Sequence, residues 1–191
     1  MKKKTLALLL SLVLVFGVIA GGTIAWLTAN SKTITNTFTY GDITIDLNET
    51  TTGYKVVPGA TDEKDPTITI DSASEKCYVY VKVENTLKAD NEVVATTDMK
   101  EEDWILVGQN GDVKLYRYKE PVTPNGKDVT LKVFEHVTYS SDKITKENIQ
   151  TVAAGKIIIT AYAHQYDNTT ITNADTSACT WAGVTAVTAG N

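Results

Sequence analysis

Apolar and polar residues alternate one by one through most of the sequence after residue 40. A period of two is typical of half-buried β-strands, because successive side chains point to opposite faces of a sheet. In the clearest run, Val79, Val81 and Val83 share one face with Cys77, which we therefore expect to point inward. Many short strands separated by turn signals predict an all-β fold, a jelly-roll-like two-sheet β-sandwich with one or two short helices.

Turn and helix signals fall between these runs. Asn110-Gly111 predicts a hairpin, since both residue types tolerate positive φ, and Pro58-Gly59 predicts a loop. The stretch TKENIQTVAAG predicts a short helix with Thr145 as its N-cap, and TSACTWAGVTA around Trp181 predicts a second helix. A length of 191 residues suits one domain with an accessory segment.

The first residues have the composition of a secretory signal. Lys2–Lys4 form a positive start, and Leu6–Ala20 form an apolar stretch. The small residues just before Trp26 fit the positions that a signal peptidase reads. We therefore expect residues 1–25 to be a signal peptide that is removed between Ala25 and Trp26, so that the protein is secreted.

A retained membrane anchor is the competing interpretation of the same stretch. No charged residue occurs between Thr5 and Ser31, and this span approaches the ~20 apolar residues of a membrane-crossing helix. Gly21-Gly22 would break such a helix early, and a polar stretch follows at once. These features favour cleavage.

The charge balance limits the choice of partners. The formal net charge is −5, and loss of the three lysines of the signal leaves 15 basic against 23 acidic residues, a net charge of −8. An acidic surface repels the phosphates of nucleic acids and of anionic lipids. We expect neither as a partner.

Groups that could carry catalysis are sparse. The sequence has two histidines, His136 and His164, and no His-Glu-x-x-His zinc motif. It also has no Gly-x-Ser-x-Gly elbow and no phosphate-binding glycine loop. The acidic residues Asp62, Glu63 and Asp65 lack the ligand spacing of a calcium loop, and a solvated loop is the expected alternative. We therefore expect no enzyme activity, no catalytic residues, no cofactor and no metal.

Cys77 and Cys179 could form a disulfide in a secreted chain. Two buried free thiols are the alternative, which we favour because two cysteines make a weak disulfide framework.

Two pairs of tyrosines occupy the polar faces of predicted strands. These are Tyr78 and Tyr80 on one strand and Tyr116 and Tyr118 on another. We expect them to be exposed sheet stabilisers, with a sugar- or protein-binding face as the alternative.

The segment from Trp26 to residue 40 is unusual for the start of a secreted chain. A Trp-Leu terminus would leave an apolar surface in water, and β-branched residues follow that favour an extended backbone. This segment can pair within its own domain, residues 41–191, or it can complete the sheet of a neighbouring copy as a donor strand. The second arrangement is head-to-tail and propagates into a fibre. Composition alone does not choose between these arrangements, and in the second one the donor strand comprises Trp26, Leu27, Ile34, Asn36 and Phe38.

Two stretches, GGTIAWLTANSKTITNTFTYGDITIDLNET and VVPGATDEKDPTITIDSASEKCYVYVKVEN, resemble the TasA/camelysin family of secreted bacterial proteins. The matching positions are Gly21, Gly22, Thr23, Ala25, Asn36, Phe38, Gly41, Leu47, Pro58, Gly59 and Asn85. The later IIITAYAHQYDN and Trp181 are loosely similar to the closing strand and tail of the family. Cys77 departs from the ordinary strand residue found in many relatives.

The resemblance implies a Gram-positive origin, processing by a signal peptidase of the SipW type and a jelly-roll fold. It also implies a structural role in the extracellular or biofilm matrix, as a fibre subunit whose partners are further copies of itself and other matrix proteins. Camelysins are described as cell-surface metallopeptidases, which is the alternative function, although this chain lacks a recognisable zinc ligand set. A monomeric secreted accessory protein that binds the cell wall or matrix is a further alternative.

Overall fold

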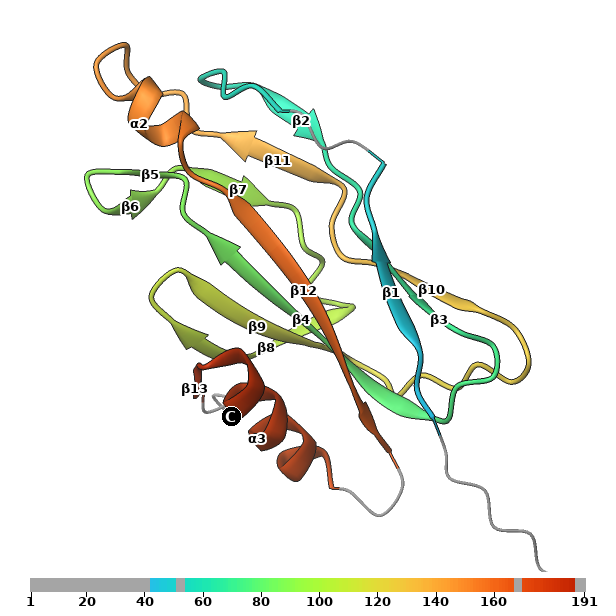
Figure 1. The fold of residues 1–191 in the computed structure, drawn as a ribbon. Coiled ribbons are helices and arrows are strands. Elements are labelled where there is room, and N and C mark those ends of the chain that lie inside the picture. The colour runs from blue at the N-terminus through green and yellow to red at the C-terminus, as the bar shows by residue number, and fades with distance from the viewer. Residues whose placement is uncertain (1–41, 51–53, 167–169, 188–191) are drawn as a thin grey trace, which may run out of the picture. The chain divides into compact units, whose positions relative to one another are not determined.

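Antiparallel strands make up most of the structure, a computed structural model that describes residues 42–50, 54–166 and 170–187. All of these residues belong to one unit of the chain, Gly41–Asn191. The all-β sandwich predicted from the alternating pattern is confirmed, and two short helices accompany it (Figure 1).

The larger sheet has five strands in the order β12-β4-β9-β8-β13. Their bounds are Ile157–Gln165 for β12, Cys77–Asn85 for β4, Val113–Tyr118 for β9, Trp104–Asn110 for β8 and Thr185–Ala186 for β13. Strand β4 lies inside this sheet, and its first five residues are all buried. A strand covered on both faces requires a layer on each side of the sheet.

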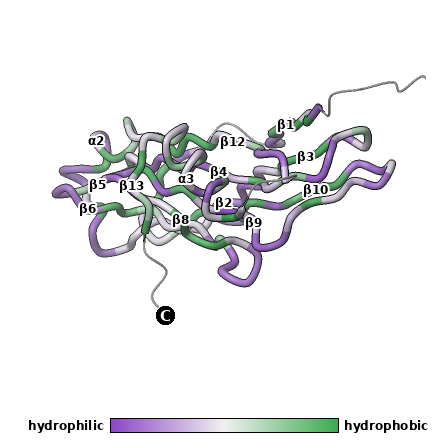
Figure 2. The backbone as a smooth tube through the Cα atoms, turned by 90° about the horizontal axis from the view of Figure 1, so that it is seen from below, coloured by the Kyte–Doolittle hydropathy of each residue, from purple (hydrophilic) through white to green (hydrophobic). Residues whose placement is uncertain are grey.

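Shorter strands form the layer on one side. One three-stranded sheet has the order β1-β3-β10 and the other has the order β2-β11-β7. Their bounds are Ile45–Asn48 (β1), Thr67–Ile70 (β3), Val129–Lys132 (β10), Thr61–Glu63 (β2), His136–Tyr139 (β11) and Ala95–Thr97 (β7). A separate hairpin pairs β5, Lys88–Ala89, with β6, Glu92–Val93. Figure 2 shows hydrophobic and hydrophilic residues alternating along the strands, and this hairpin as hydrophilic.

The main core lies between the two layers. Ile68 and Ile70 of β3 pack in one cluster with the valines of β4, as the alternation predicted. Val137 of β11 and Val152 of α2 (Ile149–Ala153) belong to the same buried cluster. The sandwich therefore closes around the apolar faces of its strands.

Helix α3, Ile171–Ala182, covers the opposite face of the five-stranded sheet (Figure 1). Its N-cap Thr170 accepts a hydrogen bond from the N–H of Asn173 at 3.3 Å, and Gly183 ends it in the left-handed conformation. Ala174 and Ala178 are fully buried, because two small residues one turn apart let the helix approach the sheet closely. The second predicted helix is therefore present as a third layer of the fold, but it begins before the predicted stretch, whose last residues, Thr185–Ala186, form β13 instead.

This helix makes the expectation of exposed tyrosines wrong for β4. Tyr78 and Tyr80 are 5% and 0% exposed, since they form a second core cluster with Leu115 beneath α3. The other pair, Tyr116 and Tyr118, is partly buried against the main core. The face of Tyr78 and Tyr80, for which ligand binding was the alternative interpretation, is therefore an interior surface.

Local signals had mixed outcomes. The Asn110-Gly111 hairpin between β8 and β9 is confirmed, with Gly111 at φ 57°. The predicted short helix is α2, but its N-cap is Asn148, whose side chain makes no capping bond. Thr145 instead accepts a hydrogen bond from the N–H of Glu147, within the turn that precedes the helix.

The two cysteines are buried free thiols in different parts of the core. Cys77 points into the main cluster, as predicted, and Cys179 lies in the cluster under α3. Burial raises the pKa of Cys77 to about 11, as expected for a thiol surrounded by apolar groups.

Within the described residues, no helix has the length and apolar character needed to cross a membrane.

Candidate functional site

Strand β12 forms an edge of the five-stranded sheet. It pairs with β4 over all nine of its residues, from Ile157 opposite Asn85 to Gln165 opposite Cys77. In the described part of the chain, β4 is the only strand that pairs with it. The other side of β12, called here the β12 edge, is a template on which a further strand can add.

Hydrogen bonds at the two ends of β12 show which peptide groups face this edge. The N–H of Thr86 donates to the carbonyl of Lys156 at 2.9 Å, and the N–H of Tyr166 donates to the carbonyl of Lys76 at 2.9 Å. Even-numbered residues therefore direct their peptide groups toward β4. Because these groups alternate along an antiparallel strand, those of Ile157, Ile159, Ala161 and Ala163 face the β12 edge.

The side chains along the edge are apolar and incompletely covered. Four inward residues of β12 pack against the main core but stay partly exposed: Ile157, Ile159, Ala161 and Ala163. Strand β1 lies alongside β12 (Figure 1), and its residues Ile45 and Leu47 are also only partly buried. The apolar side chains of the sandwich are thus only partly covered where β1 lies alongside β12.

Natural edge strands usually carry features that prevent pairing with another chain. Lysine, proline, short length and bulges are the common ones. Strand β12 has the sequence IIITAYAHQ, without lysine or proline, and its register with β4 is continuous. Its outward residue Ile158 is 44% exposed. The strand has the length and composition of a pairing surface.

A pocket of about 350 Å³ lies at the start of β12. It is called here the edge pocket, and its lining residues are Glu49, Tyr54, Val56, Lys64, Leu87, Val137, Tyr139, Ala153, Gly155, Lys156, Ile157 and Ile158. Its volume falls in the range of about 300–1,000 Å³ that is common for ligand pockets. Apolar and polar groups share its surface, and Glu49, Tyr54 and Lys64 lie together as a polar side.

A buried cation forms that polar side. The Lys64 side chain is 9% exposed and pairs with the carboxylate of Glu49, while its ammonium lies 4.8 Å from the centre of the Tyr54 ring. The hydroxyl of Tyr54 donates to Glu49 at 2.7 Å, and burial together with this carboxylate raises the pKa of Tyr54. The charge of Lys64 is therefore compensated within the pocket wall.

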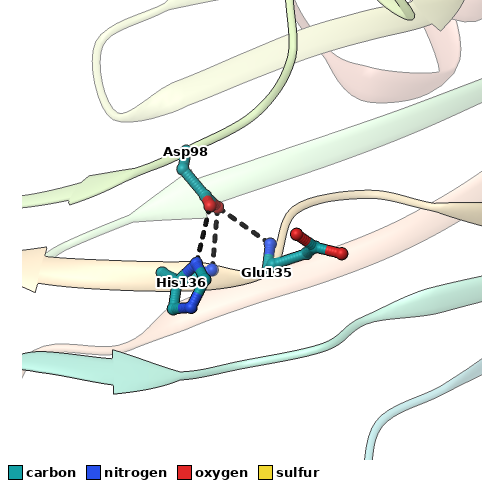
Figure 3. Close-up of side chains that lie close together, drawn as sticks. All are labelled: Asp98, Glu135 and His136. Carbon is teal, nitrogen blue, oxygen red and sulfur yellow. Dashed lines mark hydrogen bonds and ion pairs between the residues drawn. The ribbon is translucent and has the colours of Figure 1, made fainter.

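Asp98, Glu135 and His136 form the group of metal-ligating side chains found in the described residues (Figure 3). One oxygen of Asp98 accepts the N–H groups of Glu135 and His136, at 2.8 and 2.7 Å. Its other oxygen lies 2.8 Å from Nδ1 of His136. The carboxylate of Glu135 binds Nζ of Lys132 at 2.6 Å, and one of its oxygens lies within 4.8 Å of the ligand atoms of Asp98 and His136.

These contacts describe a connection between strands. Asp98 follows β7, and the two amides that it accepts lie where β10 passes into β11. The hydrogen bond with Asp98 raises the pKa of His136. Asp98 is partly desolvated, but the hydrogen bonds from His136 and the amides lower its pKa overall. The group joins two sheet segments, a role that the sequence did not suggest because the partners are 37 and 38 residues apart.

The other residues considered from the sequence do not form a site together. His164 lies on β12 with Nδ1 2.9 Å from the carbonyl of Gln165, and it does not join His136 in a metal-ligating group of the described residues. Asp62 accepts the hydroxyl of Tyr139 at 3.1 Å, and Asp65 accepts the hydroxyl of Thr50 at 2.8 Å. These two carboxylates are held by separate partners.

The expected cleavage site and donor strand lie outside the described residues. This applies to Ala25 and to the donor residues Trp26, Leu27, Ile34, Asn36 and Phe38.

No family model, no curated protein and no solved structure matches this chain.

Proposed function

We propose that this protein is a secreted structural subunit of an extracellular or biofilm matrix that assembles head to tail. In this proposal the β12 edge of one copy accepts residues 26–39 of the next copy as an additional strand. The observation that carries the proposal is the β12 edge itself, nine residues long, apolar and paired on one side among the described residues. Strand addition at a sheet edge is a general mode of protein recognition.

The chemistry of the segment suits the edge. Ile34, Asn36 and Phe38 alternate with threonines, so one face of the extended segment carries two large apolar side chains and the other face carries threonines. Phe38 and Ile34 would cover Ile157 and Ala161 of β12, at about 25 cal/mol for each Å² of apolar surface removed from water. The backbone would supply partners for the peptide groups that face the edge.

The arrangement does not close on itself. A copy that receives a strand at β12 still donates its own segment elsewhere, because the donor precedes β1 and the acceptor is a different surface. Such heterologous contacts give open polymers. The resemblance of residues 21–85 to the TasA/camelysin family supports a matrix fibre as the product, with export through a SipW-type peptidase.

Deletion of residues 26–39 tests the donor side. We expect the exported protein without this segment to remain monomeric in sedimentation and to form no filaments in electron microscopy, while its thermal unfolding stays cooperative. Normal filaments from the truncated protein would exclude the proposal.

A proline on β12 tests the acceptor side. Ala161→Pro removes an N–H that faces the β12 edge and keeps the hydrogen bonds of the even-numbered residues with β4. We expect it to prevent the copy from accepting a strand while leaving its own segment able to join a wild-type acceptor. Ile158→Lys, which places a charge on the edge without altering the backbone, is the second variant. Filaments of normal length from both folded variants would contradict the assignment of β12.

A further inference from the structure

We infer that the edge pocket is a socket for the aromatic ring of Phe38 from a second copy of the chain. This inference rests on the proposed function, and it adds which end of β12 the donor enters and which side chain anchors it. The argument uses the positions of the chain ends, the strand direction and the chemistry of the pocket.

The donor leaves its own domain at the end opposite to the edge pocket. Asp42 is the first described residue, and its carbonyl accepts a hydrogen bond from the N–H of Glu75. The residue after Glu75 is Lys76, whose carbonyl accepts a hydrogen bond from the N–H of Tyr166, just after β12. Asp42 therefore lies at the same end of the sheet as Gln165. The edge pocket is lined by Ile157 at the other end of β12, about 26 Å away at 3.3 Å per residue.

Head-to-tail stacking then fixes the direction of the donor. A segment that leaves one copy at the Gln165 end meets the next copy at the Ile157 end, if both copies have the same orientation along the fibre. The donor residues closest to their own domain, near Phe38, reach the edge pocket first, and the earlier residues continue toward Gln165. The donor therefore runs antiparallel to β12, as β4 does on the other side.

The alternation of the donor agrees with this direction. If Phe38 lies opposite Ile157, an antiparallel register places Ile34 opposite Ala161. Ile157 and Ala161 are both inward residues of β12 that pack against the main core. Phe38 and Ile34 then point to the same side, with Asn36 between them opposite Ile159, and the threonines point away from it.

The edge pocket suits an aromatic ring that brings no charge. Val56, Leu87 and Val137 provide apolar walls. The Lys64 ammonium already has Glu49 as its counter-ion, so an anionic side chain would be repelled by that carboxylate. A neutral ring needs no hydrogen-bond partner in the pocket. Its π-face can also interact with the Lys64 ammonium, which already lies over the ring of Tyr54.

Cross-linking between two differently tagged exported forms tests the socket. One form carries Phe38→Cys, and the other carries Ala153→Cys, an exposed position that lines the edge pocket. The matched control replaces Ala153→Cys by Gln165→Cys, an exposed position at the far end of β12. The native cysteines are buried and should react slowly.

We expect an intermolecular disulfide, identified by mass spectrometry, with the cysteine at position 153 and none with that at position 165. A cross-link to position 165 alone would overturn the socket while leaving strand donation in place. Polymers without a cross-link to either position would also overturn it. Absence of both polymer and cross-link at more than about a hundredfold the concentration at which the wild type polymerises would overturn the socket and the proposed function together.

The affinity of the socket is measured with donor variants that leave the described domain unchanged. Phe38→Ala should raise the lowest concentration that supports polymers roughly ten- to a hundredfold, since burial of a phenylalanine changes an association constant by about that factor. Phe38→Leu, which keeps an apolar side chain, should have a smaller effect. Equal polymerisation by Phe38→Ala and the wild type would contradict an anchoring role.

Discussion

The hydroxyl of Tyr80 on β4 donates a hydrogen bond to Oδ1 of Asp175 on α3, across 2.8 Å. Nε of Arg117, on the neighbouring strand β9, lies 3.0 Å from the same oxygen, although it is outside hydrogen-bond geometry. Burial and the Asp175 carboxylate raise the pKa of Tyr80, so the hydroxyl remains a donor at physiological pH. One carboxylate thus holds α3 against the sheet.

Removal of that carboxylate should destabilise the fold. Asp175→Ala leaves the nearly buried Arg117 without its counter-ion and Tyr80 without its acceptor, which should cost about 2–3 kcal/mol of the free energy of unfolding. Asp175→Asn keeps an acceptor for Tyr80 and should cost less. Urea unfolding followed by fluorescence measures the stability of both variants. Equal stability of Asp175→Ala and the wild type would show that the contact makes no net contribution to the free energy of unfolding.

Close packing at Gly155 should make this position intolerant of a side chain. A Cβ there would lie 2.6 Å from the carbonyl oxygen of Thr86 and 2.9 Å from Cα of Leu87, both backbone atoms. We expect Gly155→Ala to lower the free energy of unfolding by about 2 kcal/mol. Gly108→Ala is the comparison, because the two closest atoms there belong to side chains, those of Val184 and Cys179, which can shift. A larger loss of stability in Gly108→Ala than in Gly155→Ala, measured by thermal unfolding, would contradict this ranking.

The contact between His136 and Asp98 should make stability depend on pH. The pKa of His136 is raised above its ordinary value of 6.5 by the hydrogen bond with Asp98. Its contribution is therefore complete below pH 6.5 and is lost as the pH rises through the raised folded pKa. The pKa of Asp98 is lowered, so its contribution is present above its ordinary value of 3.8 and is lost as the pH falls through the folded value.

An NMR titration of the His136 imidazole measures this coupling. We expect a midpoint above 6.5 in the wild type and a return toward 6.5 in Asp98→Asn. Glu63→Gln should change the midpoint less, because the effect of Glu63 on His136 is the smallest of those identified. An unchanged midpoint in Asp98→Asn would show that the pair is not formed in solution.

The peptidase alternative has its own test. In this group, one oxygen of Asp98 accepts hydrogen bonds from two backbone amides, and Glu135 pairs with Lys132. These side chains therefore already make structural contacts. We expect casein to remain intact when it is incubated with the exported protein and zinc. Cleavage that a chelator stops and that His136→Gln abolishes would establish the alternative.

The sequence predicted those features that depend on neighbouring residues. Period-two alternation located β4 correctly, and Asn110-Gly111 located the hairpin between β8 and β9. Cys77 points inward because its parity matches that of the valines around it. Local backbone preferences decide these features, so no knowledge of the remote chain is needed.

Features that depend on remote contacts were not predicted. Tyr78 and Tyr80 were predicted to be exposed, but tyrosine occurs both at exposed and at buried positions. Only the packing of α3 against the sheet decides that these two are buried. The spacing of Ala174 and Ala178 was the available signal for a closely packed helix. The β12 edge could not be recognised either, since a strand in the middle of a sheet and one at its border share the same alternation.

The central claim is tested most directly by binding a synthetic peptide of residues 26–39 to the chain that lacks them. Hydrogen exchange followed by NMR reports each amide of β12 separately. We predict saturable one-to-one binding that protects the N–H groups of Ile157, Ile159 and Ala161, which face the β12 edge, and leaves those already bonded to β4 unchanged. Absence of binding, or protection confined to another part of the chain, would contradict donor-strand assembly at this edge.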